Sequence, residues 1–101
     1  MSRREQLEQM LAGSPNDLFL KYAVAMAYST EGDSAEAQRR LADINLTHPD
    51  DVASWFQRGK LLAKLGEEDA ARDVLTSGIA TAQRMGNDHA EGEMRGFLEM
   101  L

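Results

Sequence analysis

Cysteine is absent from this chain of 101 residues. Its absence excludes disulfides, thiolate zinc sites and cysteine nucleophiles together. A stable fold must therefore be held together by packing alone.

Basic charge and long apolar runs are also scarce. Eleven Lys and Arg stand against seventeen Asp and Glu, a net charge of -6. Such a surface repels phosphate backbones, so we expect no nucleic-acid partner.

The longest apolar run, Leu18 to Tyr28, is interrupted by Lys21 and is too short to span a bilayer. The N-terminus lacks the apolar region of a signal peptide, so we expect a soluble, cytoplasmic protein without a membrane partner.

The residue patterns of common enzymes are missing as well. His48 lies in a Thr-His-Pro turn, and His89 begins the last amphipathic segment. Nothing in the sequence holds a nucleophile or a second acid/base group beside either histidine. His89 and Glu93 are four residues apart, but two ligands do not close a metal site. The glycines are scattered and form no phosphate loop. We expect no enzyme activity, no cofactor and no metal.

A 34-residue spacing organises what is present. Pro15 recurs at Pro49 and Gly32 at Gly66. Leu7 recurs at Leu41, 34 residues later. A period of this length indicates stacked helical hairpins that present a surface to other molecules.

Periodicity and capping signals predict six helical segments. Ser2 and Glu5 form a capping box at the first, and Asp33 and Glu36 suggest another at the third. Apolar stripes predict the faces that pack inward. For the first and third segments these stripes are Leu7, Met10 and Leu11, and Ala37, Leu41, Ile44 and Leu46.

Small residues mark where the helices cross. Ala25 and Gly59 fall one period apart on the first helix of each hairpin, and Ala37 and Ala71 do so on the second. Two helices that cross closely need little side-chain volume at the contact. The shared spacing therefore predicts the same close crossing twice.

These residues resemble the tetratricopeptide repeat family. The second repeat matches at the positions Trp55, Gly59, Leu62, Leu65, Gly66, Ala71 and Leu75. It departs from the family pattern at Arg58, where Leu is favoured, and Lys21 stands one period before Trp55. The resemblance implies an all-α, right-handed stack of antiparallel helix pairs. Within a single domain over residues 1–101 we expect a leading half-repeat helix at 2–13, repeats at 16–49 and 50–83, and a capping helix at 87–101.

The resemblance also implies a binding groove, because the first helix of each hairpin lines the concave face in this family. By register, the groove residues are Phe19, Tyr22, Met26, Phe56, Gln57, Lys60 and Lys64. The family's carboxylate clamp for chaperone tails is not matched, since Tyr22, Met26, Phe56 and Lys60 hold its Lys and Asn places. We expect a non-catalytic interaction module or scaffold that binds a peptide or partner helix, with Lys60 and Lys64 meeting negative charge. The alternative for these residues is interhelix core with two solvated lysines.

A second surface lies in the last segment, where four apolar residues share one face: Met94, Phe97, Leu98 and Leu101. This stripe predicts either a cap that folds back over the fifth helix or a self-association surface. The second case makes the protein an assembly element that homodimerises. A third alternative is a regulatory subunit of a partner enzyme.

Overall fold

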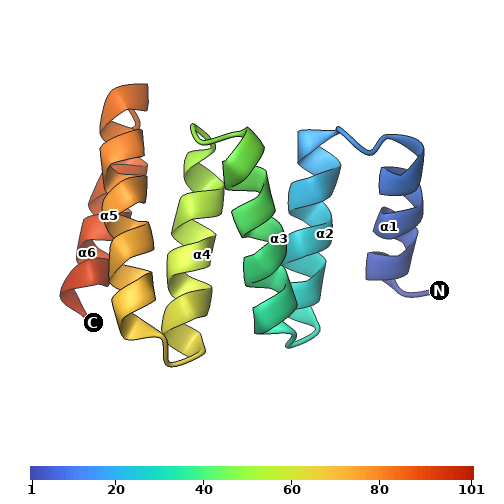
Figure 1. Cartoon of the computed structure of the whole chain (residues 1–101), viewed down its shortest axis with the longest axis horizontal. Coiled ribbons are helices and arrows are strands. Elements are labelled where there is room, and N and C mark those ends of the chain that lie inside the picture. The colour runs from blue at the N-terminus through green and yellow to red at the C-terminus, as the bar shows by residue number, and fades with distance from the viewer.

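Six helices and no strand make up the computed structural model, which describes residues 1–101. The helices are α1 (Arg3–Gly13), α2 (Leu18–Thr30), α3 (Ser34–Thr47), α4 (Val52–Lys64), α5 (Glu68–Met85) and α6 (Asp88–Glu99). Successive helices run antiparallel and lie in a row from the N-terminus to the C-terminus (Figure 1). None of them has the length and apolar character needed to cross a membrane.

Local signals in the sequence determine where these helices begin and turn. Ser2 Oγ accepts from Glu5 N at 3.1 Å, while Glu5 Oε1 accepts from Ser2 N at 3.0 Å, which completes the predicted capping box. At α3 only half of the second box forms. Asp33 accepts from the Glu36 backbone, but the Glu36 carboxylate accepts hydrogen bonds from arginines on its own helix. Gly32 and Gly66 both adopt positive φ, 86° and 80°, in the equivalent turns after α2 and α4.

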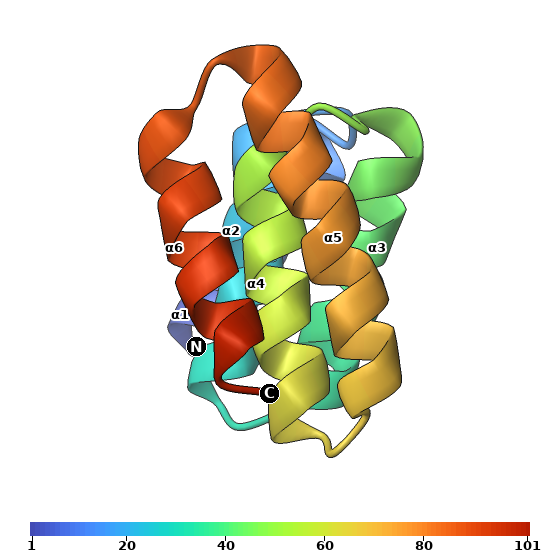
Figure 2. The ribbon, with the colours of Figure 1, turned by 90° about the vertical axis from the view of Figure 1, so that its left-hand side faces the viewer.

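The helices form two layers. α3 and α5 lie on one side, with α2, α4 and α6 toward the other (Figure 2). Each helix packs against the next along the chain, and α4 also contacts α6. The resulting stack measures 39 × 28 × 20 Å. The predicted all-α hairpin stack is confirmed.

Small residues allow the close crossings that their spacing predicts. Ala25, Ala37 and Ala71 are completely buried. At Gly59, an added Cβ would lie 2.4 Å from Leu75 Cδ2, far inside van der Waals contact. An alanine at this position would therefore require the buried Leu75 side chain to shift or the two helices to separate.

Each of two predicted apolar stripes includes one residue that the structure leaves exposed to solvent. Met10 and Leu46, expected on inward faces, are 57% and 82% exposed. The end of the helix is not the reason, because Leu11 and Asn45, which follow or precede them in the same turns, are half-buried and buried; Met10 and Leu46 lie on the uncovered sides of α1 and α3. Leu7, Leu41 and Ile44 are buried as predicted.

Candidate functional site

A line of large side chains follows the outer face of α2. Asp17 caps this helix by accepting from Leu20 N at 3.0 Å. The next residues then place Phe19, Tyr22 and Met26 at positions i, i+3 and i+7, on one face. Phe19 is 75% exposed, whereas Tyr22 and Met26 are half-buried. This half of the predicted groove therefore offers apolar surface to solvent.

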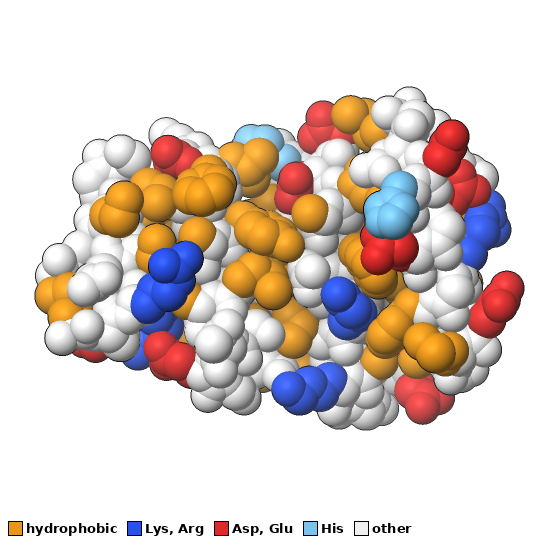
Figure 3. All heavy atoms as spheres, turned by 180° about the vertical axis from the view of Figure 1, so that it is seen from behind, with side chains coloured by type: hydrophobic (Ala, Val, Ile, Leu, Met, Phe, Trp, Pro, Cys, Tyr) orange, Lys and Arg blue, Asp and Glu red, His pale blue; other side chains and the backbone are white.

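Two hollows border this line, and Tyr22 belongs to both. One has a volume of about 320 Å³ and is lined by Leu18, Phe19, Tyr22, Asp51 and Ala53. The other has a volume of about 430 Å³ and is lined by Arg3, Arg4, Tyr22, Ala23, Met26, Ala27, Thr30 and Glu31. Seen from behind, apolar side chains form a broken band across the molecule, with a few Lys and Arg among them (Figure 3).

Tyr22 also connects α2 to α4. Burial, and next the negative charge of Asp51, raise the pKa of its phenol, and the nearby Gln57 side chain opposes this rise. The phenol is thus neutral at physiological pH, since tyrosine already titrates near pH 10 in water. It sits between the two hollows as an uncharged polar group.

The α4 half of the predicted groove is arranged differently. The Phe56 ring packs edge-on against Phe97 of α6, with centroids 6.4 Å apart and planes at 76°. Lys60 Nζ lies 4.3 Å from the Phe56 ring centroid, a cation–π geometry. Lys64 is exposed in the last turn of α4. α6 therefore covers part of Phe56, and the sequence gave no signal for this contact beyond the apolar character of Phe97.

Lysine is the one basic residue type that takes part in no ion pair here. The cations of the ion pairs are Arg4, Arg39, Arg40, Arg72 and Arg95, and His89 contacts Glu93. Lys60 and Lys64 therefore remain available to negative charge from outside the chain. The assignment of all seven residues to one binding groove stays a prediction.

The C-terminal stripe packs within the chain. Met94 is completely buried, and Phe97, Leu98 and Leu101 pack against the cluster that it forms with Leu75, Ile79 and Ala82. Phe97, Leu98 and Leu101 nevertheless stay half-buried, so part of the stripe remains at the surface. The homodimer alternative likewise stays a prediction.

A polar network around Arg58 joins α3 to α4. Arg58 is the position where the family pattern favours Leu. Arg58 donates to Gln38 Oε1 at 3.2 Å and to Asn45 Oδ1 at 3.1 Å, and its guanidinium lies 4.7 Å from the Trp55 ring centroid. Burial lowers its pKa. Asn45 in turn donates to two backbone carbonyls, those of His48 and Asp51. Arg58 thus links α4 through hydrogen bonds to α3 and to the α3–α4 connection, whereas Leu at this position could only pack.

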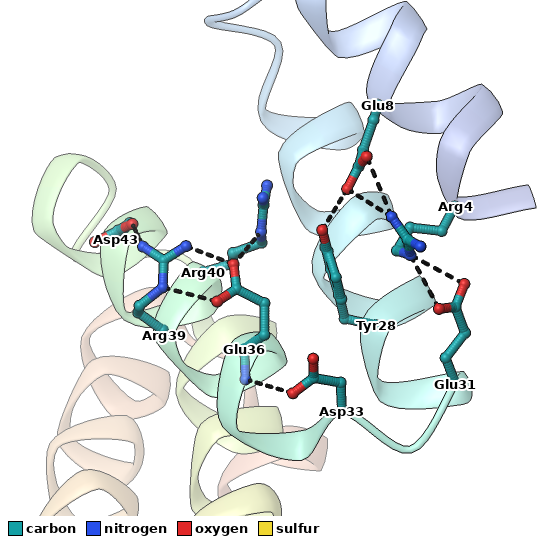
Figure 4. Close-up of polar contacts among 9 residues, drawn as sticks. All are labelled: Arg4, Glu8, Tyr28, Glu31, Asp33, Glu36, Arg39, Arg40 and Asp43. Carbon is teal, nitrogen blue, oxygen red and sulfur yellow. Dashed lines mark hydrogen bonds and ion pairs between the residues drawn. The ribbon is translucent and has the colours of Figure 1, made fainter.

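A second network fixes α1 on the stack (Figure 4). Tyr28 Oη donates to Glu8 Oε1 at 2.5 Å, and this bond is the main cause that lowers the Glu8 pKa. Arg4 bridges Glu8 and Glu31, with its Nε 3.0 Å from both Glu31 oxygens. Because Arg4 and Glu31 also line the larger hollow beside Tyr22, this network shapes one wall of the candidate surface.

The histidines are not brought together. His89 Nε2 lies 3.1 Å from Glu93 Oε1, and His48 Nδ1 lies 2.9 Å from the Thr47 hydroxyl. No group of three or more His, Cys, Asp or Glu side chains is placed to hold a metal ion.

Comparisons with known proteins agree with this architecture. No family model matches the chain. A TPR repeat-containing protein of Pseudomonas aeruginosa is 33% identical over 97 residues, which span 96% of this chain and 92% of the relative. A solution structure of a Bordetella parapertussis protein superposes with a TM-score of 0.88 at 27% identity, over 99% of this chain and 87% of the other. The crystal structure of a tetratricopeptide repeat domain protein from Salinibacter ruber gives 0.79 at 26% identity, over 84% and 94%.

Proposed function

Because the chain belongs to the tetratricopeptide repeat family, we propose that it is a non-catalytic interaction module that binds a peptide or partner helix across α2 and α4. Proteins of this family generally mediate protein–protein interactions. In this proposal residues 16–49 and 50–83 are the two repeats, 2–13 the helix of a truncated leading repeat, and 87–101 the closing helix.

The observation that carries the proposal is the uncovered line on α2. Phe19, Tyr22 and Met26 follow the i, i+3, i+7 spacing, and hollows lie on both sides of Tyr22. A partner segment that lays apolar side chains into these hollows would bury the exposed Phe19 ring. Complete burial of one such side chain is worth about 1.5–3 kcal/mol before the cost of association is subtracted, so the partner needs several apolar anchors.

The lysines of α4 give the partner a charge preference. Lys60 and Lys64 are one helical turn apart and have no carboxylate partner in the chain. In a protein of net charge -6, acidic partners are otherwise repelled. We therefore propose that the bound segment combines apolar anchors with a carboxylate, and that the lysines set its orientation more than its affinity.

A peptide-display selection on the immobilised chain tests both parts. We expect enriched peptides to combine apolar and acidic residues and to lose binding to Phe19→Ser. The matched control is Met100→Ser, because Met100 is equally exposed, at 75%, but lies at the far end of the stack. The charge-reversed variant Lys60→Glu, Lys64→Glu should select peptides without acidic enrichment. Equal binding to wild type, Phe19→Ser and Met100→Ser would show that the α2 line is not the site.

A further inference from the structure

Among the positions at which the two repeats differ, one has a structural role that can be seen in the second repeat. Trp55 lies on α4, and 34 residues earlier its place on α2 is taken by Lys21. Trp55 Nε1 donates to the Pro49 carbonyl at 2.8 Å. A Cβ added at Gly78 of α5 would lie only 2.9 Å from Trp55 Cβ. The tryptophan thus fills the space between the α3–α4 connection and α5.

The corresponding space in the first repeat is open. A pocket of about 430 Å³ lies among α1, α2 and α3, lined by Leu11, Lys21, Arg40, Asp43, Ile44, Leu46 and Thr47. We call it the α1/α3 pocket. Lys21 and Ile44 lie one period before Trp55 and Gly78, so the pocket occupies the place that the tryptophan takes in the second repeat.

The lining of this pocket is apolar at its base and basic at its side. Ile44 is 2% exposed, whereas Leu46 projects into solvent. Lys21 takes part in no ion pair. Arg40 is already engaged within the chain, because its Nε donates to Glu36 at 2.8 Å and its guanidinium lies 4.8 Å from the Tyr28 ring centroid. Asp43 is the single carboxylate, and it already faces Arg39 at 3.4 Å.

We propose that the α1/α3 pocket binds an aromatic side chain of a partner protein that carries an Asp or Glu next to it. The aromatic ring packs on Ile44 and Leu11 and restores the packing that Trp55 supplies one period later. The neighbouring carboxylate contacts Lys21, the cation of the pocket lining that has no ion-pair partner in the chain, whereas Arg40 is paired with Glu36. This pocket shares no residue with the seven proposed groove residues on α2 and α4. An experiment can therefore refute either binding proposal without refuting the other.

The probes are three blocked tetrapeptides, Ac-Ala-Trp-Glu-Ala-NH₂ and its relatives with Gln for Glu or Ala for Trp, titrated into the ¹⁵N-labelled chain. We expect the Trp-Glu peptide to shift the amide resonances of Ile44, Leu46 and Thr47. The Trp-Gln peptide should bind about tenfold more weakly, the factor of one charge-assisted contact, and the Ala-Glu peptide should not bind. Equal binding of the Glu and Gln peptides, or no shift with any peptide, would overturn the proposal.

Variants at Lys21 separate a pocket from a surface contact. Lys21→Trp should fill the pocket from within, abolish binding and raise the thermal midpoint. Lys21→Met keeps the pocket open and removes the charge, so it should bind the Glu peptide as weakly as wild type binds the Gln peptide. Lys60→Met, the matched control on the other surface, should bind like wild type. If Lys21→Trp folds and still binds, or if the resonances that move belong to the α2 line, the assignment is wrong.

Discussion

Gly59 gives the sharpest test of the packing on which this fold depends. A methyl group there would lie 2.4 Å from Leu75 Cδ2 and 2.6 Å from Leu75 Cγ, and Leu75 is completely buried. Ordinary carbon contacts lie at about 3.5–4.0 Å, so either the buried Leu75 side chain shifts within the core or α4 and α5 move apart by roughly 1 Å. Overpacking of this kind costs about 1–3 kcal/mol, while replacing glycine in a helix returns about 1 kcal/mol. We therefore expect Gly59→Ala to lower the free energy of unfolding by a net amount of up to about 2 kcal/mol.

Urea denaturation followed by circular dichroism measures this change. The control is Gly96→Ala, because nothing lies within 4 Å of an added Cβ at Gly96, which is also inside a helix. This control should gain about 0.5–1 kcal/mol, so the two substitutions have opposite signs. In a Leu75→Ala background the penalty at Gly59 should disappear, since the conflicting side chain is gone. A Gly59→Ala protein as stable as Gly96→Ala would refute the close crossing.

Two further measurements address charge and assembly. Hydrogen bonds from Arg39 and a second arginine lower the pKa of Glu36 to about 2, below its ordinary 4.5; its stabilising contribution is therefore complete above pH 4.5 and is lost as pH falls toward 2. Glu36→Gln should make stability depend less on pH in that window, and an unchanged acid titration would contradict this account. For Phe97→Asp we expect lower stability without a change in sedimentation, because Phe97 packs on Phe56 within the chain. A wild-type dimer that this variant dissociates would instead support the assembly alternative.

Much of the fold follows from local signals in the sequence. The capping box at Ser2 and the positive-φ turn at Gly32 depend on residues a few positions apart, so reading them requires no knowledge of the tertiary structure. The crossing of α4 and α5 was also predictable, because Gly59 and Ala71 lie one period after Ala25 and Ala37. In a repeat protein the same helix contact occurs twice. A small residue that recurs at both contacts therefore indicates a packing requirement and not chance.

The candidate site was less predictable, for a physical reason that particular residues illustrate. Whether Leu46 or Phe56 is covered depends on which sides of its helix the neighbouring helices occupy, and the apolar residues of one helix do not specify this. Leu46 lies on the uncovered side of α3 and is 82% exposed, whereas α6 packs on Phe56. The resemblance located α2 and α4 on one surface, but the partial cover over α4 arises from a helix outside the two repeats.

Departures from the period then indicate where this chain differs from a generic stack. Positions such as Ala37 and Ala71 repeat because the fold needs them, so they say nothing about a partner. Arg58 breaks the pattern and is satisfied internally, through Gln38 and Asn45. Lys21 breaks it as well, but pairs with no carboxylate and leaves a space that a side chain fills in the next repeat. A residue such as Arg58, whose hydrogen bonds are all made within the chain, is explained by its structural role. A residue such as Lys21, which leaves an unpaired charge beside an open apolar pocket, favours a role in binding another molecule.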